Sequence, residues 1–130
     1  MDAENINEFV ILGYKGKVVN NDLMTNPEDG WVEGWYFEDH EKGKVRSYIF
    51  SCPCRWEVFP ESVAQYTGFK DKEDNPIYIK DIVKSVSTGD IGTVISKDGV
   101  IEVYWDRFGI PTLLRMVNDK LLVIGTEFEG

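Results

Sequence analysis

The sequence predicts an all-β protein with one short helix. Aromatic residues make up 13% of the chain and include four Trp, six Tyr and seven Phe, a composition that favours strands over helices. Short apolar or alternating runs recur along the chain, and turns rich in Gly, Asn, Asp and Pro separate them. The 130 residues suit one domain or two very small ones, and we expect two subdomains, residues 1–65 and 66–130.

The first half is expected to form an amino-terminal β subdomain. The expected strands are Phe9–Leu12, for which a helical turn is the alternative, Tyr14–Val19, Trp31–Phe37, Val45–Phe50 and Trp56–Phe59. Residues 39–44 are expected to be the polar turn of a hairpin. Gly34, inside the strongest strand, indicates either a β-bulge or the close approach of a neighbouring strand.

Residues 60–66 differ in kind from the strands around them. Pro60 can occupy the first position of a helix, because its missing N–H would have no partner there. Glu61 suits the positive end of a helix dipole. We therefore expect one or two turns of helix over residues 61–66, ended near Gly68, and a change of subdomain at this point.

The second half is expected to be a small barrel. After a strand start at Ile77, the expected strands are Asp81–Val86, Thr93–Ser96, Val100–Trp105 and Leu121–Gly125. Asp98-Gly99 between β-branched runs is the strongest hairpin signal in the chain. Five short strands within about sixty residues favour closure into a barrel, because closure removes exposed strand edges.

The net charge of −9 limits the classes of partner. Affinity for nucleic acid comes largely from Lys and Arg that neutralise phosphates, so an acidic chain argues against nucleic acid. No apolar run approaches the ~18 residues of a membrane-spanning helix, and the amino terminus lacks the basic segment of a signal peptide. We therefore expect a cytoplasmic protein with no membrane partner.

The two cysteines, Cys52 and Cys54, are expected to be reduced and structural. A zinc site usually takes four ligands from two separated pairs. The chain offers only this one pair and a single histidine, His40. We expect neither a metal nor a cofactor.

Residues 60–83 carry a family resemblance. Val63 and the run Gln65-Tyr66-Thr67-Gly68 lead to Lys70-Asp71-Lys72, and then to Ile77-Tyr78 and Asp81-Ile82-Val83. This pattern resembles the YopX family, small proteins of bacteriophages and prophages. Looser matches lie at Gly16-Lys17, at residues 30–34 and at Val123-Ile124-Gly125.

The chain departs from the family pattern at three places: Ala64, Glu73–Pro76 and Lys80. The second departure predicts a different type of turn near residue 74. The resemblance implies an all-β fold with a carboxy-terminal barrel similar to SH3 barrels, in a protein that acts in a bacterial host. It transfers no catalytic residue.

Three sets of residues are candidate sites, and for each set a purely structural role also explains why these residues are present. Gly89–Val94 resembles the loop of nucleic-acid-binding SH3-like modules, but glycines required by a turn explain the same residues. The set Glu38, Asp39, His40 and Glu41 suits metal binding or acid–base work, and a solvated hairpin tip is the simpler explanation.

The third set lies in the family pattern and comprises Thr67, Lys70, Asp71, Lys72 and Asp81. Catalysis would need a poised base beside a nucleophile, which this set lacks. We expect Thr67 and Gly68 to end the helical turn, and Asp71 to hold the following loop through side-chain–backbone hydrogen bonds. We expect Asp81 to anchor the linker between the two halves.

Trp105, Arg107 and Phe108 are the candidate binding residues, because aromatic side chains and Arg are enriched at interface centres. A corner of the core is the alternative role for these residues. We expect a non-enzymatic protein-interaction module, with a nucleic-acid-associated SH3-like module as the alternative. An acidic surface suits a basic protein partner or mimicry of nucleic acid, and strand edges allow a homo-oligomer.

Overall fold

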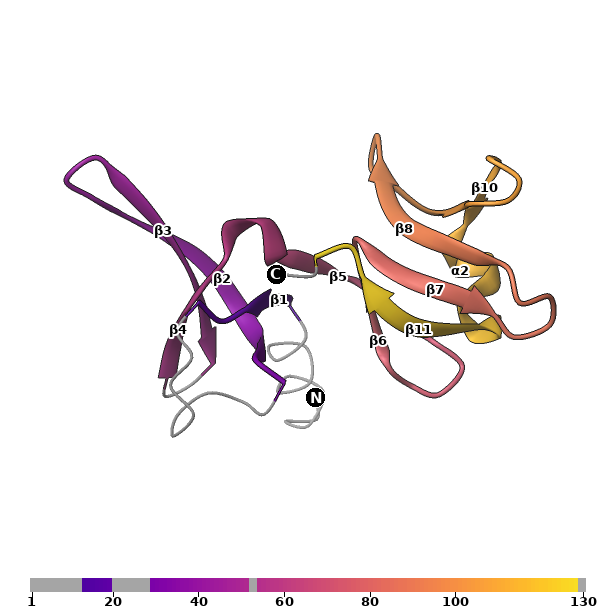
Figure 1. The fold of residues 1–130 in the computed structure, drawn as a ribbon, viewed down its shortest axis with the longest axis horizontal. Helices are drawn as coiled ribbons and strands as arrows, with labels where there is room; N and C mark the ends of the chain where they lie inside the picture. Colours follow the sequence, from indigo (N-terminus) through magenta and orange to yellow (C-terminus); the bar gives the residue numbers. More distant parts are fainter. Residues whose placement is uncertain (1–12, 20–28, 52–53, 129–130) are drawn as a thin grey trace, which may run out of the picture. The chain divides into compact units, whose positions relative to one another are not determined.

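The computed structural model describes residues 13–19, 29–51 and 54–128, and antiparallel β-strands dominate it (Figure 1). This confirms the predicted all-β class with minor helix. The chain divides into two compact units, and the boundary falls between Gln65 and Tyr66. The strand expected at Phe9–Leu12 lies outside the described residues.

The first unit is built on a sheet in the order β4-β3-β2-β1-β5. Its strands are β1 (Tyr14–Lys17), β2 (Trp31–Glu41), β3 (Lys44–Ser51), β4 (Cys54–Val58) and the start of β5 (Ala64–Lys70). All neighbours in this order are antiparallel. One face of the sheet buries a small core formed by Val18, Val32, Ile49 and Val58.

The hairpin of β2 and β3 is longer than predicted. Glu41 pairs with Lys44, so the loop consists of Lys42 and Gly43 alone. Both residues have positive φ, 51° and 78°, as a type I′ turn requires. The prediction of a turn over residues 39–44 is wrong because this tight turn lets strand pairing continue to Glu41.

Gly34 lies where the backbone of β3 passes close to β2. A Cβ at Gly34 would overlap the carbonyl oxygen of Phe50 and lie 3.3 Å from Cγ2 of Ile49. Of the two structures predicted for Gly34, a β-bulge or a close neighbouring strand, the structure therefore contains the second.

The helix predicted over residues 61–66 is wrong. Pro60–Ser62 forms a single 3-10 turn, η1, and the backbone is already extended at Val63, with φ −67° and ψ 125°. Ala64 then pairs with Lys15 of β1, so the chain continues as β5 through the predicted helix end at Gly68. Pairing with β1 supplies hydrogen bonds to the backbone, whereas a helix of one or two turns is only marginally stable in water. The first unit thus ends in a strand.

The second unit contains a five-stranded antiparallel sheet in the order β10-β9-β8-β7-β11. Its strands are β7 (Asp81–Ser85), β8 (Ile91–Lys97), β9 (Val100–Trp105), β10 (Pro111–Leu113) and β11 (Leu121–Thr126). The predicted Asp98-Gly99 hairpin is confirmed, since Lys97 pairs with Val100 and both loop residues have positive φ. The short strand β6 (Pro76–Tyr78) pairs with the end of β5.

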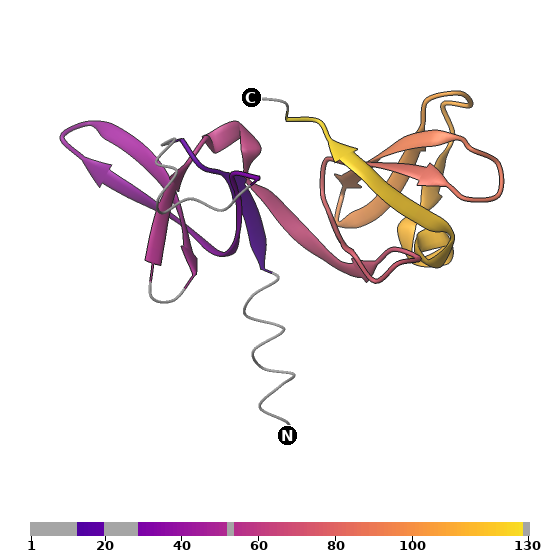
Figure 2. The ribbon, with the colours of Figure 1, turned by 60° about the horizontal axis from the view of Figure 1, so that its bottom comes forward.

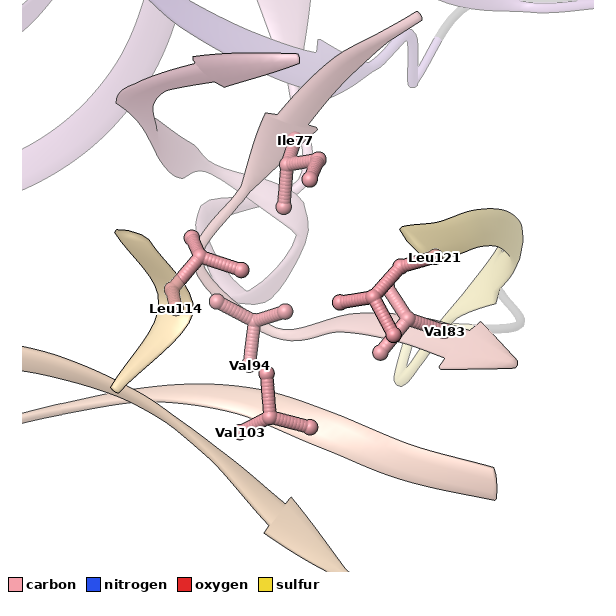
Figure 3. Packing of buried hydrophobic residues seen from close by; sticks show 6 residues of the cluster. All are labelled: Ile77, Val83, Val94, Val103, Leu114 and Leu121. Atoms are coloured by element: carbon pink, nitrogen blue, oxygen red, sulfur yellow. The ribbon is translucent and has the colours of Figure 1, made fainter. Parts of the chain in front are cut away.

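Two short elements that the sequence pattern does not predict connect β10 to β11: the helix α2 (Leu114–Val117) and the 3-10 turn η2 (Asn118–Lys120). Leu114 is fully buried in the core of this unit. Figure 3 shows that core, formed by Ile77, Val83, Val94, Val103, Leu114 and Leu121. In the described part of the chain, no helix has the length and apolar content needed to cross a membrane.

The sheet of the second unit places the last strand, β11, beside the first, β7, as closure into a barrel would require. Figure 2 shows the orange and yellow strands of this unit curving around a common interior. The strand pairs of the described residues form a series with ends at β10 and β11. The SH3-like barrel therefore stays a prediction.

Replacing Gly34 by Ala is expected to destabilise the first unit by about 1–3 kcal/mol, because the added methyl group overlaps the backbone of β3. Gly125→Ala is the matched control, since a Cβ there meets nothing within 4 Å. Urea unfolding followed by tryptophan fluorescence measures both variants. A Gly34→Ala midpoint equal to that of the control would show that the strands do not approach so closely.

Candidate functional site

The residues that match the family pattern, Gln65 to Lys70, contain a bulge in β5. Tyr66 pairs with Tyr78 and Lys70 with Pro76, so β5 carries more residues than β6 over the same span. Gly68 takes a φ of 89° inside this bulge. The Thr67 hydroxyl donates to the carbonyl of Ile77 at 2.7 Å and accepts from the N–H of Phe69 at 3.1 Å. The predicted role of Thr67 and Gly68 in ending a helix is therefore wrong.

The buried carboxylate of Asp71 organises the connection from β5 to β6. Its Oδ1 accepts from the N–H groups of Glu73 and Asn75, each at 2.9 Å. This confirms the prediction that Asp71 holds the following loop. Its Oδ2 accepts from the N–H of Val123 in β11 at 2.9 Å, a contact that the sequence did not indicate. These donors replace the water that a buried carboxylate loses.

Asp81 is also buried and serves the next turn. Its Oδ2 accepts from the N–H of Tyr78 at 2.9 Å, across a turn in which Lys80 has a φ of 78°. Both residues belong to the second unit. The bond shown for Asp81 thus holds a turn inside one unit, whereas the prediction assigned it to a linker between the two halves.

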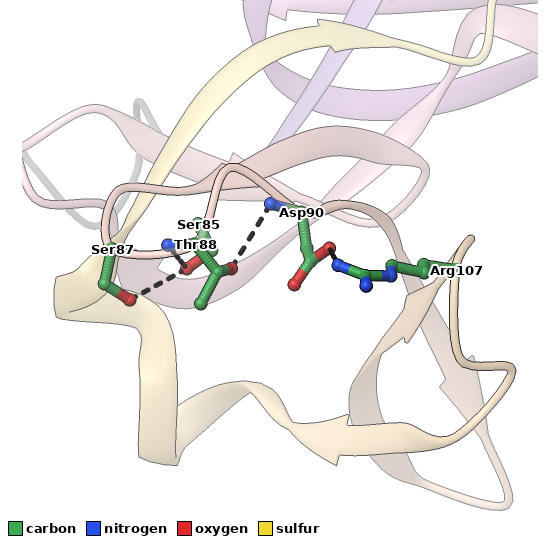
Figure 4. A network of polar contacts seen from close by, with 5 residues as sticks. All are labelled: Ser85, Ser87, Thr88, Asp90 and Arg107. Carbon is green, nitrogen blue, oxygen red and sulfur yellow. Dashed lines mark hydrogen bonds and ion pairs between the residues drawn. The ribbon is translucent and has the colours of Figure 1, made fainter.

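The turn before Gly89–Val94 is held by its own polar groups (Figure 4). The hydroxyl of Ser85 accepts from the N–H of Thr88 at 3.4 Å, and the hydroxyl of Thr88 accepts from the N–H of Asp90 at 3.3 Å. Nη1 of Arg107 lies 3.6 Å from Oδ1 of Asp90. A phosphate at this turn would have to displace Asp90 from Arg107.

His40 lies within β2 and not at the hairpin tip. Its Nε2 is 3.5 Å from Oε1 of Glu38, and both side chains are exposed. The hydroxyl of Tyr36 donates to Oε2 of Glu38 at 2.8 Å. Partial burial raises the pKa of Tyr36, and the Glu38 carboxylate raises it further, so the hydroxyl stays a donor. Among the residues that the structure describes, no cluster of three or more His, Cys, Asp or Glu could hold a metal ion.

Cys54 is a free thiol at the exposed start of β4. Its exposure shows that it contributes little to the core, and its reduced state stays a prediction. Cys52 lies outside the described residues.

The structure separates the three candidate binding residues. Trp105 is partly buried and packs against the core of the second unit. Its Nε1 donates to Oγ1 of Thr112 at 2.9 Å. Arg107 and Phe108 are exposed, and the guanidinium carbon of Arg107 lies 5.2 Å from the centre of the Phe108 ring. Trp105 thus takes the alternative role at a corner of the core, and Arg107 and Phe108 lie at the surface.

Two further residues extend this surface. Tyr104 is 46% exposed and Ile110 is 67% exposed, beside Phe108 at 55%. Tyr104 pairs with Pro111, and a Cβ on Gly109 would lie 3.4 Å from the Tyr104 hydroxyl, which places these residues together. Strand alternation was the available signal, because an inward Trp105 directs Tyr104 outward. We call Tyr104, Arg107, Phe108 and Ile110 the loop surface.

A separate apolar groove of about 450 Å³ lies at the other end of β9. It is lined by Phe69, Gly99, Val100, Ile101, Leu113 and Arg115. Its volume is in the range of small-molecule sites, and Arg115 is the charged residue among the described residues that line it.

Replacing Asp71 by Ala is expected to destabilise the second unit by about 2–4 kcal/mol, because the N–H groups of Glu73, Asn75 and Val123 lose a charged acceptor. Asp119→Ala, at an exposed position, is the control and is expected to change stability by less than about 0.5 kcal/mol. Urea unfolding measures both. Equal stability of the two variants would show that Asp71 does not hold the loop.

Comparisons with known proteins bear on the whole chain. A search of curated proteins gives no match. A comparison with protein families matches residues 13–130 to the family described as YopX protein. This match spans both units, including the bulge at Thr67 and the loop held by Asp71. The chain therefore belongs to the YopX protein family.

Proposed function

We propose that this chain is a non-enzymatic protein-interaction module that contacts its partner through the loop surface. The observation that carries the proposal is the exposure of three large apolar side chains, Tyr104, Phe108 and Ile110, beside the guanidinium of Arg107. Aromatic side chains and Arg are the residues most enriched among those that dominate binding energy.

The backbone of the loop surface is held by hydrogen bonds. The N–H of Gly109 donates to the carbonyl of Trp105 at 3.0 Å, and the N–H of Asp106 donates to the carbonyl of Ile91 at 3.0 Å. The Trp105–Thr112 bond ties the start of the loop to β10. A loop fixed in this way loses little conformational entropy when a partner binds, which favours affinity.

The hydrogen bonds of the buried carboxylates support a binding function over a catalytic one. Asp71 and Asp81 both accept hydrogen bonds from backbone N–H groups, which is a structural use. The proposal includes no cofactor. For the alternative, an SH3-like module that binds nucleic acid at Gly89–Val94, Arg107 is paired with Asp90, and the exposed Lys84, which pairs with Ile91, is a cation left to attract a phosphate.

The proposed partner is a protein with basic and apolar residues. The chain carries a net charge of −9, and Asp90 and Asp106 lie next to the loop surface. Such a charge speeds association with a cationic partner. From the family membership we further propose a phage or prophage origin and action in the cytoplasm of a bacterial host.

A photo-cross-linking residue in place of Phe108 tests the proposal in the bacterial host. We expect one protein to be cross-linked from position 108 and not from position 124, where Ile124 is a matched exposed apolar residue. The same protein captured from both positions would overturn the assignment of the surface. A second copy of this chain as the captured protein would replace the proposed partner with self-association.

The captured protein then allows a direct affinity measurement. Phe108→Ala with Arg107→Ala is expected to weaken binding about 30-fold or more in titration calorimetry, because both side chains are placed as anchors of the interface. Ile124→Ala should bind as the unchanged protein does. Equal affinity of the loop variant would contradict the proposal.

A further inference from the structure

The sheet of the first unit has an outer face that the sequence pattern did not reveal. Successive side chains of a strand point to opposite faces, and Val32 and Ile49 point into the core. The opposite side of β2 and β3 carries five aromatic residues: Trp31, Trp35, Phe37, Tyr48 and Phe50. We call this set the aromatic face.

The aromatic residues form two neighbouring cross-strand pairs. Trp35 pairs with Phe50, and the two are 42% and 41% exposed. Phe37 pairs with Tyr48, and their rings are stacked with centres 5.2 Å apart at an interplanar angle of 16°. The first pair therefore offers accessible rings beside a second, packed pair.

Cations surround these rings from both edges of the face. From β1, the Nζ atoms of Lys15 and Lys17 lie 5.2 Å and 5.7 Å from the centre of the Trp31 ring. From β4, Arg55 pairs with Phe50, and its guanidinium carbon lies 5.0 Å from the centre of the Tyr48 ring.

The basic residues of the first unit are concentrated on the aromatic face of its sheet. Apart from Lys42 in the turn, every Lys and Arg of residues 1–65 occupies a strand position of the aromatic face. The net charge of −9 describes the whole chain and hides this local concentration. Acidic residues share the face at Glu33, Asp39, Glu41 and Glu57, so its net charge is small.

We propose that the aromatic face binds single-stranded nucleic acid. Bases stack on the accessible rings of Trp35 and Phe50, while Lys15, Lys17 and Arg55 meet the phosphates on either side. Surfaces that bind single strands combine such stacking rings with cations that follow the backbone. Rings alone would suit a protein partner, whereas cations on both sides of an exposed ring pair suit a chain of flat bases with a charge at every nucleotide.

The acidic residues of the aromatic face limit the expected affinity for nucleic acid. Glu33, Asp39, Glu41 and Glu57 repel phosphates, so binding should be weak and should fall steeply as salt is added. This inference concerns the first unit and is independent of the loop surface, which lies in the second unit.

Fluorescence anisotropy of the full chain with a labelled oligothymidylate of about 16 nucleotides, at about 50 mM salt, tests the inference. Trp35→Ala with Phe50→Ala is expected to weaken binding about tenfold or more, because two stacking platforms are lost. Ile124→Ala, at an exposed position of β11, is the control and should bind as the unchanged chain does. No binding at low salt, or equal binding by the ring variant, would overturn the proposal.

A second set of variants keeps the test valid if the ring variant fails to fold. Lys15→Gln, Lys17→Gln and Arg55→Gln together should lower the slope of log affinity against log salt by about 2, at roughly 0.7 for each phosphate contact on a single strand. An unchanged slope would contradict the proposal. So would duplex DNA that binds as tightly as the single strand, since its bases cannot stack on the rings.

Discussion

The buried carboxylate of Asp71 is the interaction on which the second unit depends most. It joins the loop of Glu73 and Asn75 to Val123, which lies 52 residues away in the sequence. The N–H of Lys72 adds a bond to the carbonyl of Leu121 at 2.9 Å. Since β11 ends the series of paired strands, these bonds cover part of an edge that would otherwise stay open to other strands.

Much of the fold could be predicted because its signals are local. Asp98-Gly99 selects one type of tight turn, Gly34 indicates close strands, and Asp71 is followed by the N–H groups that it can reach. The prediction of a helix at residues 61–66 is wrong because Pro60 and Glu61 favour a helical start, while pairing with the distant β1 decides the outcome. No local signal marks such a partner.

The candidate site could be predicted only in part, for a related reason. A loop with Trp, Arg and Phe indicates a candidate segment, but burial separates Trp105 from Arg107 and Phe108. The aromatic face stayed hidden because Trp35, Phe50 and Arg55 become neighbours through the register of three strands. The two proposed surfaces belong to different units, with apolar contact proposed for the second and stacking with charge proposed for the first.

The residues of the family pattern hold the fold together, and the proposed functions lie on the surfaces. Hydrogen exchange of individual backbone amides, followed by NMR, tests this most directly. The amides of Asn75 and Val123 donate to the buried Asp71, so they should exchange as slowly as amides in the centre of the second sheet. Exchange of the Asn75 amide as fast as in an unfolded chain would contradict the account.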